Sequence, residues 1–213
     1  MENNSKFKNY NENRSEILKY IPSGIKRMLD VGCSSGNFSA LVKSQMSVEI
    51  WGIEIDAVAA ENAKKHLDKV IVGDIKQNMN QLPSSYFDCI VFNDILEHLY
   101  DPGDILIGMK RYLLKEGVIV ASIPNFREIV NLYNLLIKED LEYKEWGILD
   151  RTHLRFFTKK SIRRMFEESG FTIIKIEGIN ANLGWKMKLL NILTFGLIKD
   201  TQYLQFLIIA KAV

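Results

Sequence analysis

The chain has 213 residues, a formal net charge of +2 and 47% hydrophobic residues, which fits one folded globular domain with a proper core. The small net charge argues against a dedicated nucleic-acid surface, and no apolar run is long enough to span a bilayer. The two cysteines, Cys33 and Cys89, offer neither a disulfide framework nor metal-ligand spacing, so we expect no metal.

The first half of the chain alternates short apolar runs with helical patterns. A polar, asparagine-rich stretch is followed by helical spacing over residues 14–21, so we expect an amino-terminal helical segment within 1–24. Strands are predicted at 28–31, 48–54, 70–72 and 87–92. Asp56 is predicted to cap a helix that runs through Leu67. With no signal pattern visible at the amino terminus, we expect a cytoplasmic protein.

The second half continues the alternation. Asp101 and Pro102 are predicted to open a helix to Leu114, and Thr158 a helix to Ser169 and Gly170. Further strands are expected at 118–123, 171–177 and 203–212. Within 126–150 we expect a helix with one apolar face, formed by Ile129, Leu132, Tyr133 and Leu136. The alternation predicts one α/β domain over 1–213 with a doubly wound, mostly parallel sheet, in which 126–157 and 179–200 are insertions over the active site.

A glycine turn between the first strand and its helix is the main functional signal. Asp30 ends the apolar run, and Gly32, Ser34 and Gly36 follow before the helical pattern that contains Phe38. Such a turn leaves backbone N–H groups facing a crevice, and we expect the two glycines to let a ligand approach the backbone. A dinucleotide fingerprint would need glycine at 32, 34 and 37, so Ser34 and Asn37 break it.

Three polar residues stand at the ends of the following strands. Glu54, about twenty residues past the turn, is placed to accept from ribose hydroxyls, although a nicotinamide cofactor would suit it as well. Asp74 and Asn93 end the next two strands. Taken singly, Glu54 could be a solvated strand-end acid, Asp74 a turn residue and Asn93 a cap.

These motifs resemble those of the class I S-adenosylmethionine-dependent methyltransferases. Residues 30–36, Asp-Val-Gly-Cys-Ser-Ser-Gly, are similar to their first motif, with Ser34 at the middle glycine. Residues 88–99, which contain Leu96-Glu97-His98, are similar to small-molecule methyltransferases, including quinone-pathway O-methyltransferases. Residues 10–22, 122–125 and 147–158 resemble a bacterial group found with glycosyltransferases of cell-surface polysaccharide synthesis.

The resemblance implies a Rossmann-like, seven-stranded sheet whose last strand is antiparallel, and S-adenosylmethionine as the cofactor. Its adenine would lie between Ile55 and Ile75, with Asp74 accepting from the amino group and Asn93 beside the methionine part. Arg14, spaced from Tyr10 as in that group, would hold the methionine carboxylate through a two-pronged contact, unless it is a solvated helix charge.

The acceptor side is predicted at 150–158. His153 lies between Arg151 and Arg155 and could take a proton from an acceptor hydroxyl, while the arginines could hold a phosphate or carboxylate. The alternative for His153 is a structural role, which we favour for His98, and His66 carries no functional argument.

The sequence therefore predicts methyl transfer to a small polar acceptor, a hydroxyl of a sugar or glycan precursor. A non-catalytic protein that binds S-adenosylmethionine is the alternative from another class, and a nicotinamide-dependent reductase is disfavoured by the turn. The apolar segment 183–199 could be a lid or a homodimer contact, ranked ahead of contact with a membrane surface, or simply core.

Overall fold

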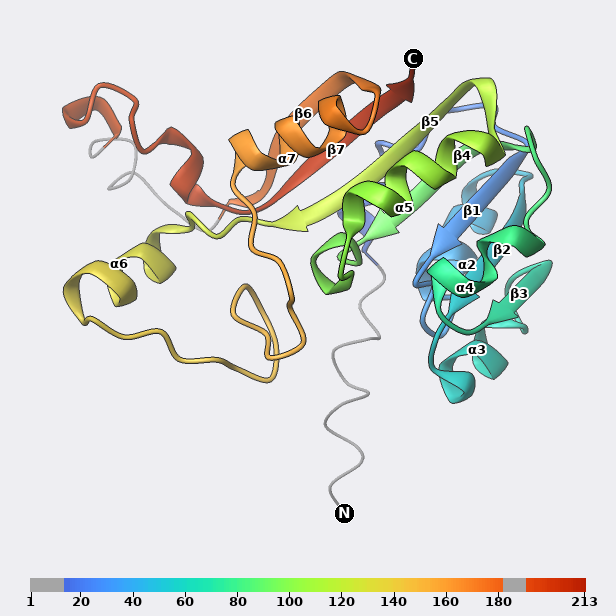
Figure 1. Cartoon of the computed structure of the whole chain (residues 1–213), viewed down its shortest axis with the longest axis horizontal. Helices are drawn as coiled ribbons and strands as arrows, with labels where there is room; N and C mark the ends of the chain where they lie inside the picture. The colour runs from blue at the N-terminus through green and yellow to red at the C-terminus, as the bar shows by residue number, and fades with distance from the viewer. Residues whose placement is uncertain (1–13, 182–190) are drawn as a thin grey trace.

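The computed structural model describes residues 14–181 and 191–213, and within them seven strands form one sheet in the order β3-β2-β1-β4-β5-β7-β6 (Figure 1). The strands are β1 Arg27–Val31, β2 Glu49–Glu54, β3 Lys69–Val72, β4 Phe87–Asn93, β5 Leu113–Pro124, β6 Phe171–Ala181 and β7 Tyr203–Ala212.

Strand directions match the predicted fold. The pairs from β3 through β5 are all parallel, whereas β7 pairs antiparallel with both β5 and β6. The predicted doubly wound sheet with an antiparallel last strand is confirmed. Strand order reverses between β1 and β4, and ligands of such sheets bind at this point, outside the carboxyl ends of the strands.

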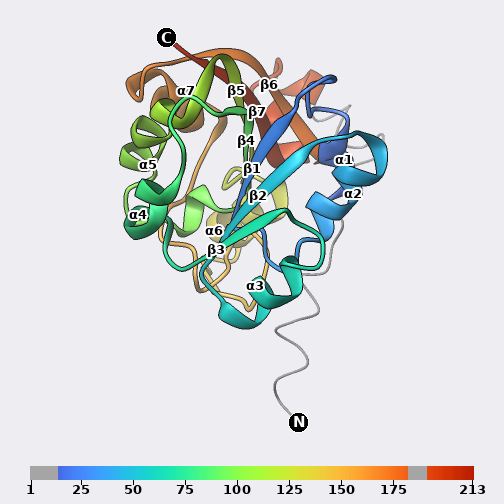
Figure 2. The same ribbon diagram turned by 90° about the vertical axis from the view of Figure 1, so that its right-hand side faces the viewer.

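Helices cover both faces of the sheet, with α1 and α2 on one side and α4, α5 and α7 on the other (Figure 2). The α-helices are α1 Ser15–Leu18, α2 Asn37–Gln45, α3 Ala57–Ala63, α4 Ile75–Asn78, α5 Pro102–Met109, α6 Ile129–Ile137 and α7 Lys159–Glu168. Short 3₁₀ turns are η2 Met79–Gln81, η3 Leu96–His98, η4 Lys110–Tyr112 and η5 Lys199–Gln202.

The core divides into two layers because side chains alternate along a strand. In β4, Ile90 and Phe92 join the cluster that contains α5 and α7 residues, whereas Cys89 and Val91 join the cluster that contains Ile17 and residues of α2. All four β4 side chains are buried, which accounts for the near-continuous apolar run of this central strand.

Three helices, α3, α5 and α7, begin directly after their predicted N-cap residues. The Asp56 side chain accepts from the backbone N–H groups of Val58 and Ala59, and Thr158 forms a capping box with Ser161. Asp101 caps α5, whose first residue is Pro102.

Several helix and strand bounds differ from prediction. The helix expected over 14–21 ends at Leu18, and the strand expected over 171–177 continues to Ala181. The helix after Asp56 ends at Ala63, and α5 ends at Met109 rather than Leu114. Strand β5 begins at Leu113 because this residue pairs with Phe87 across a register shift. The polar residues between Leu114 and Gly117 hid this extension, since they look like a turn in sequence.

The insertion containing α6 extends beyond the carboxyl ends of the parallel strands (Figure 1). Its predicted apolar face is largely uncovered, with Tyr133 and Leu136 exposed by 51% and 69%. In the other predicted insertion, residues 182–190 lie outside the described part of the chain. Within residues 14–181 and 191–213, none of the helices has the length and apolar character needed to cross a bilayer.

Candidate functional site

The glycine turn links β1 to α2 through left-handed backbone. Gly32, Ser34 and Gly36 have φ angles of 71°, 47° and 81°, and Gly36 N donates to Cys33 O at 2.8 Å. Ser34, the departure from the motif, thus holds a conformation that glycine adopts more easily. Strained backbone of this kind gathers at binding sites, in agreement with the predicted crevice.

The packing around Gly32 and Gly36 gives a further reason for glycine at both positions. A Cβ on Gly32 would overlap the Ile95 side chain, and one on Gly36 would lie 3.1 Å from Ala63 Cα. The missing side chains therefore make room for neighbouring protein, and the approach of a ligand to this backbone stays a prediction. The close packing fixes the turn against η3 and α3.

Glu54 joins the turn to the start of α3. Its side chain accepts from Ser34 N and from Asp56 N, both at 2.8 Å, and the residue is 8% exposed. A carboxylate oxygen can accept more than one hydrogen bond, so both Glu54 oxygens remain able to accept from a ligand hydroxyl. The neighbouring Ile55 is 70% exposed and offers an apolar surface next to this carboxylate.

Asp30 and Ile75 are interior residues. Asp30 is 2% exposed, accepts from Ser39 Oγ of α2 at 2.7 Å, and has its pKa raised to about 7 by burial. Asp30 thus links the end of β1 to α2 on either side of the turn. Ile75 is 5% exposed and belongs to the core, and its contact with the adenine ring stays a prediction.

Asp74 serves as the N-cap of α4, where its side chain accepts from Lys76 N and Gln77 N at 2.9 and 3.2 Å. This is the turn role weighed as the alternative in the sequence. The cap occupies Oδ1 alone, so contact with a ligand amino group through Oδ2 stays a prediction.

Asn93, at the end of β4, has a buried amide group that the rest of the described chain leaves unsatisfied. Neither its Oδ1 nor its Nδ2 has a hydrogen-bond partner in residues 14–181 and 191–213. A buried amide without partners is costly, so this side chain is suited to bind a polar ligand at the strand end.

The next residue, Asp94, is the centre of a network that the sequence did not reveal. It forms an ion pair with Arg14, and it accepts from Ser122 Oγ at 3.0 Å and from Gln205 Nε2 at 2.8 Å. Arg14 also donates to Ser122 Oγ at 3.0 Å and lies 3.3 Å from Glu16. Arg14 is thus fixed at the carboxyl edge of the sheet by protein partners, and its contact with the methionine carboxylate stays a prediction.

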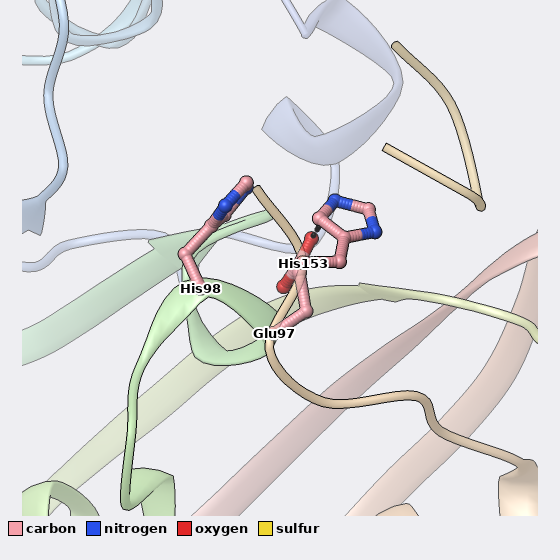
Figure 3. Close-up of side chains that lie close together, drawn as sticks. All are labelled: Glu97, His98 and His153. Carbon is pink, nitrogen blue, oxygen red and sulfur yellow. Dashed lines mark ion pairs between the residues drawn. The ribbon is translucent and has the colours of Figure 1, made fainter. Parts of the chain in front are cut away.

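A second cluster forms where residues 147–155 pack against η3. Glu97, His98 and His153 come together there (Figure 3), and their ligand atoms all lie within 4.8 Å of one another. The backbone carbonyl of Glu97 holds the loop, since Leu154 N and Arg155 N both donate to Glu97 O, at 2.9 and 3.0 Å.

Burial shifts the pKa values of Glu97 and His98 in this cluster. Glu97 is 1% exposed, and desolvation together with the nearby Asp94 carboxylate raises its pKa well above the usual range. Desolvation and the neighbouring His153 lower the pKa of His98. His153, the predicted base, has a side chain that is 6% exposed, with Nε2 3.9 Å from Glu97 Oε1.

His153 is a predicted site residue, His98 has a predicted structural role, and Glu97 had no role of its own in the sequence prediction. The rings of His98 and His153 lie 4.7 Å apart, edge to face, so the two histidines share one site. Arg151 and Arg155 point to protein partners: Arg151 is 3.1 Å from Glu145, and Arg155 donates to Tyr100 O at 2.6 Å.

A separate cavity of about 370 Å³ lies between α5 and α7 and is lined by Asp101, Ile107, Arg155 and Arg164 among others. It includes none of the residues predicted to bind the cofactor, although Arg155 and Phe157 of its lining belong to the predicted acceptor segment 150–158.

Strand order, the turn at the switch point and the strand-end acid define the class as a Rossmann-like methyltransferase fold. Solved structures agree. The chain superimposes on an S-adenosylmethionine-dependent methyltransferase from Archaeoglobus fulgidus with a TM-score of 0.69 and 22% identity, covering 97% of this chain and 94% of that one. One from Aquifex aeolicus gives 0.64 and 16%, covering 98% of each chain.

Residues 4–176 match the family model described as "Methyltransferase domain", and the chain belongs to this family. Curated relatives include the mitochondrial ubiquinone biosynthesis O-methyltransferase of Schizosaccharomyces pombe, 24% identical over 74% of this chain and 59% of the relative. A ribosomal protein L11 methyltransferase of Thermosipho africanus is 31% identical over 62% of this chain and 50% of the relative. The chain spans about half the length of the curated relatives it matches.

Proposed function

We propose that the chain transfers a methyl group from S-adenosylmethionine to a hydroxyl of a small polar acceptor, a sugar or glycan precursor. The observation that carries the cofactor is Glu54, fixed beside the glycine turn by Ser34 N and Asp56 N at 2.8 Å. A carboxylate held in this way is prepared to accept from the two ribose hydroxyls without further ordering.

The remaining cofactor contacts follow the carboxyl edge of the sheet. The exposed Ile55 covers one face of the adenine, and Asp74 accepts from its amino group. The unsatisfied amide of Asn93 binds the methionine part, whose carboxylate lies toward Arg14. Arg14 would then share its donors between Asp94 and the ligand.

The chemistry needs alignment more than activation. The acceptor oxygen attacks the methyl carbon in line, the carbon–sulfur bond breaks, and S-adenosylhomocysteine leaves as a neutral thioether. The acceptor proton passes to a base, the role predicted for His153. Orientation of this kind is worth roughly 7–11 kcal/mol in favourable cases.

Two acceptor classes are supported by different observations. The resemblance of residues 147–158 to methyltransferases of polysaccharide synthesis favours a sugar hydroxyl. The similarity to the ubiquinone biosynthesis O-methyltransferases of Schizosaccharomyces pombe and Actinobacillus pleuropneumoniae favours a phenolic hydroxyl. Both are O-methylations and need the same cofactor geometry.

Cofactor choice is tested by calorimetric titration with S-adenosylmethionine and with NADH. Glu54→Ala should weaken S-adenosylmethionine by about 1–3 kcal/mol, because buried hydroxyls lose their acceptor. Glu61→Ala, on the exposed side of α3, is the matched control and should bind normally. Unchanged affinity in a folded Glu54→Ala variant, or preference for NADH, would overturn the site.

Catalysis is tested by acceptor-dependent release of S-adenosylhomocysteine from nucleoside-diphosphate sugars, free hexoses and catechols. We expect release with the sugar acceptors. Release with catechols alone would move the assignment to the phenolic class. Cofactor binding with no release for any acceptor would favour the non-catalytic binding protein.

A further inference from the structure

We propose that Glu97, His98 and His153 bind a divalent first-row transition-metal ion. Among the residues that the structure describes, they are the one group of three metal-ligating side chains found within reach of a common ion, with ligand atoms no more than 4.8 Å apart. Ligands of a tetrahedral zinc ion stand about 3.4 Å apart, so small side-chain movements would close the site.

The first support is the environment of the Glu97 carboxylate. The residue is 1% exposed, and neither Oε1 nor Oε2 has a hydrogen-bond partner in the described chain. A buried carboxylate is normally paired or coordinated, because desolvation without compensation is expensive. Figure 3 shows this carboxylate directed at the histidine from the other segment.

The second support is the way in which the two histidines are held. His153 Nδ1 lies 3.0 Å from Ile148 O, and His98 Nδ1 lies 3.2 Å from Thr152 O. A carbonyl oxygen can only accept, so each contact needs the proton on Nδ1 and leaves a lone pair on Nε2. Metal-binding histidines are fixed in the same manner, with the second ring nitrogen donating to a carbonyl.

The third support is that both segments are fixed by backbone contacts. Leu154 N and Arg155 N donate to Glu97 O, and His153 N donates to Asp150 O at 3.1 Å. The loop that carries His153 is therefore tied directly to the 3₁₀ turn that carries Glu97 and His98. A preformed arrangement of this kind favours binding, since little ordering is left to do.

The ligand set selects the metal. Two imidazoles and one carboxylate suit Zn²⁺, Mn²⁺, Fe²⁺ or Co²⁺, whereas Mg²⁺ and Ca²⁺ prefer oxygen ligands. Three protein ligands leave coordination positions for water or for another oxygen, as in catalytic zinc sites.

The position gives the metal a function. Glu97 stands four residues beyond Asn93, at the strand end where the cofactor's methionine part is placed. If the proposed methyl transfer holds, a cation here would bind the acceptor hydroxyl and lower its pKa, so that the hydroxyl proton would pass to solvent water and no histidine base would be needed. In this assignment His153 is a metal ligand rather than the proton acceptor.

The test is metal binding by the full chain, without cofactor or acceptor. Chelator-treated protein is titrated with Zn²⁺, Mn²⁺ and Mg²⁺ by calorimetry, and with Co²⁺ by visible absorption. We expect one equivalent of Zn²⁺ or Co²⁺, with Mg²⁺ much weaker. Glu97→Gln and His153→Ala should each weaken binding by more than roughly 100-fold, because outer-sphere partners alone account for 10–100-fold.

His66→Ala is the matched control, since His66 is exposed and outside the cluster. Circular dichroism checks folding, and His98→Ala, at a half-buried position, provides a second ligand variant if the buried changes disturb the fold. Absence of Zn²⁺ and Co²⁺ binding, or binding that survives Glu97→Gln and His98→Ala, would overturn the proposal. S-adenosylmethionine affinity is measured separately, so a failure of the methyltransferase proposal and a failure of the metal site give different results.

Discussion

The glycine turn and the Glu97–His98–His153 cluster sit at the same edge of the sheet but are built differently. The polar groups of the turn are bonded within residues 30–56, as when Ser34 N donates to Glu54 and Ser39 donates to Asp30. The cluster joins two distant segments and leaves the Glu97 carboxylate without a hydrogen-bond partner in the described chain. A motif whose polar groups are hydrogen-bonded within the protein can hold a ligand in place. A buried polar group without a hydrogen-bond partner indicates that a ligand binds to it.

The largest expected effect is a loss of turnover when the cluster is altered at His153. His153→Asn should lower turnover roughly 10²–10⁴-fold, whether the imidazole acts as a base or orders the acceptor through a metal, since the acceptor proton then lacks its route. S-adenosylmethionine affinity should stay unchanged, because the turn does not depend on this loop. His66→Asn is the control, and turnover within a few-fold of the unaltered enzyme would return His153 to a structural role.

This contrast also explains what the sequence could predict. The strands, the caps at Asp56 and Thr158 and the turn are local patterns, and the structure confirms them. Pairing of Leu113 with Phe87 depends on a register that no local pattern reveals.

The residues of the candidate site also fall into those predicted from a local pattern and those that depend on distant segments. Glu54 could be predicted as a site residue because strand-end acids follow the turn at a regular spacing. Asp94 and Glu97 were missed because their roles depend on Arg14, Gln205 and His153, which come from distant parts of the chain. The Leu96-Glu97-His98 triplet was a visible signal, but only the fold brings His153 to it.

The second-largest expected effect is a pH dependence of stability that comes from Asp30, which is buried below the turn. Burial raises the pKa of Asp30 to about 7, above the value of about 3.9 in an unfolded chain. The folded state therefore holds more protons between these two values, so this group's contribution to stability falls as pH rises from about 4 to 7, by up to about 4 kcal/mol. Asp30→Asn removes the ionisation.

We expect Asp30→Asn to be more stable, relative to the unaltered protein, at pH 8 than at pH 5, as measured by urea unfolding at both pH values. Asp104→Asn, at an exposed position of α5, is the control and should show little difference between the two. A stability difference that does not grow with pH would mean that Asp30 is ionised in the folded protein without penalty.

The third effect measures how tightly the turn is packed against η3. Gly32→Ala places a methyl group into Ile95 and an L residue at a φ of 71°, and should cost about 1–3 kcal/mol of unfolding free energy. Gly24→Ala is a matched control, because Gly24 has a φ of 80° and open space around it. The difference between the two variants isolates the contact.

Adding Ile95→Ala to Gly32→Ala should recover part of this loss, and the double-mutant cycle gives the coupling free energy. Equal costs for Gly32→Ala and Gly24→Ala would show that backbone strain alone requires glycine at the turn.

The smallest effect separates the two roles of Arg14. Lysine keeps the charge but lacks the two guanidinium nitrogens that donate separately to Asp94 and Ser122. Arg14→Lys should therefore lower the unfolding free energy by about 0.5–1.5 kcal/mol, the value of one lost hydrogen bond. If Arg14 also holds the methionine carboxylate, S-adenosylmethionine affinity falls in the same variant.

Arg127→Lys is the control, since Arg127 lies 2.9 Å from Asp200 in a comparable pair outside the predicted cofactor contacts. Loss of stability in both variants, with cofactor affinity lowered only by Arg14→Lys, is the expected result. Unchanged affinity would confine Arg14 to its protein network and leave the methionine carboxylate to another donor.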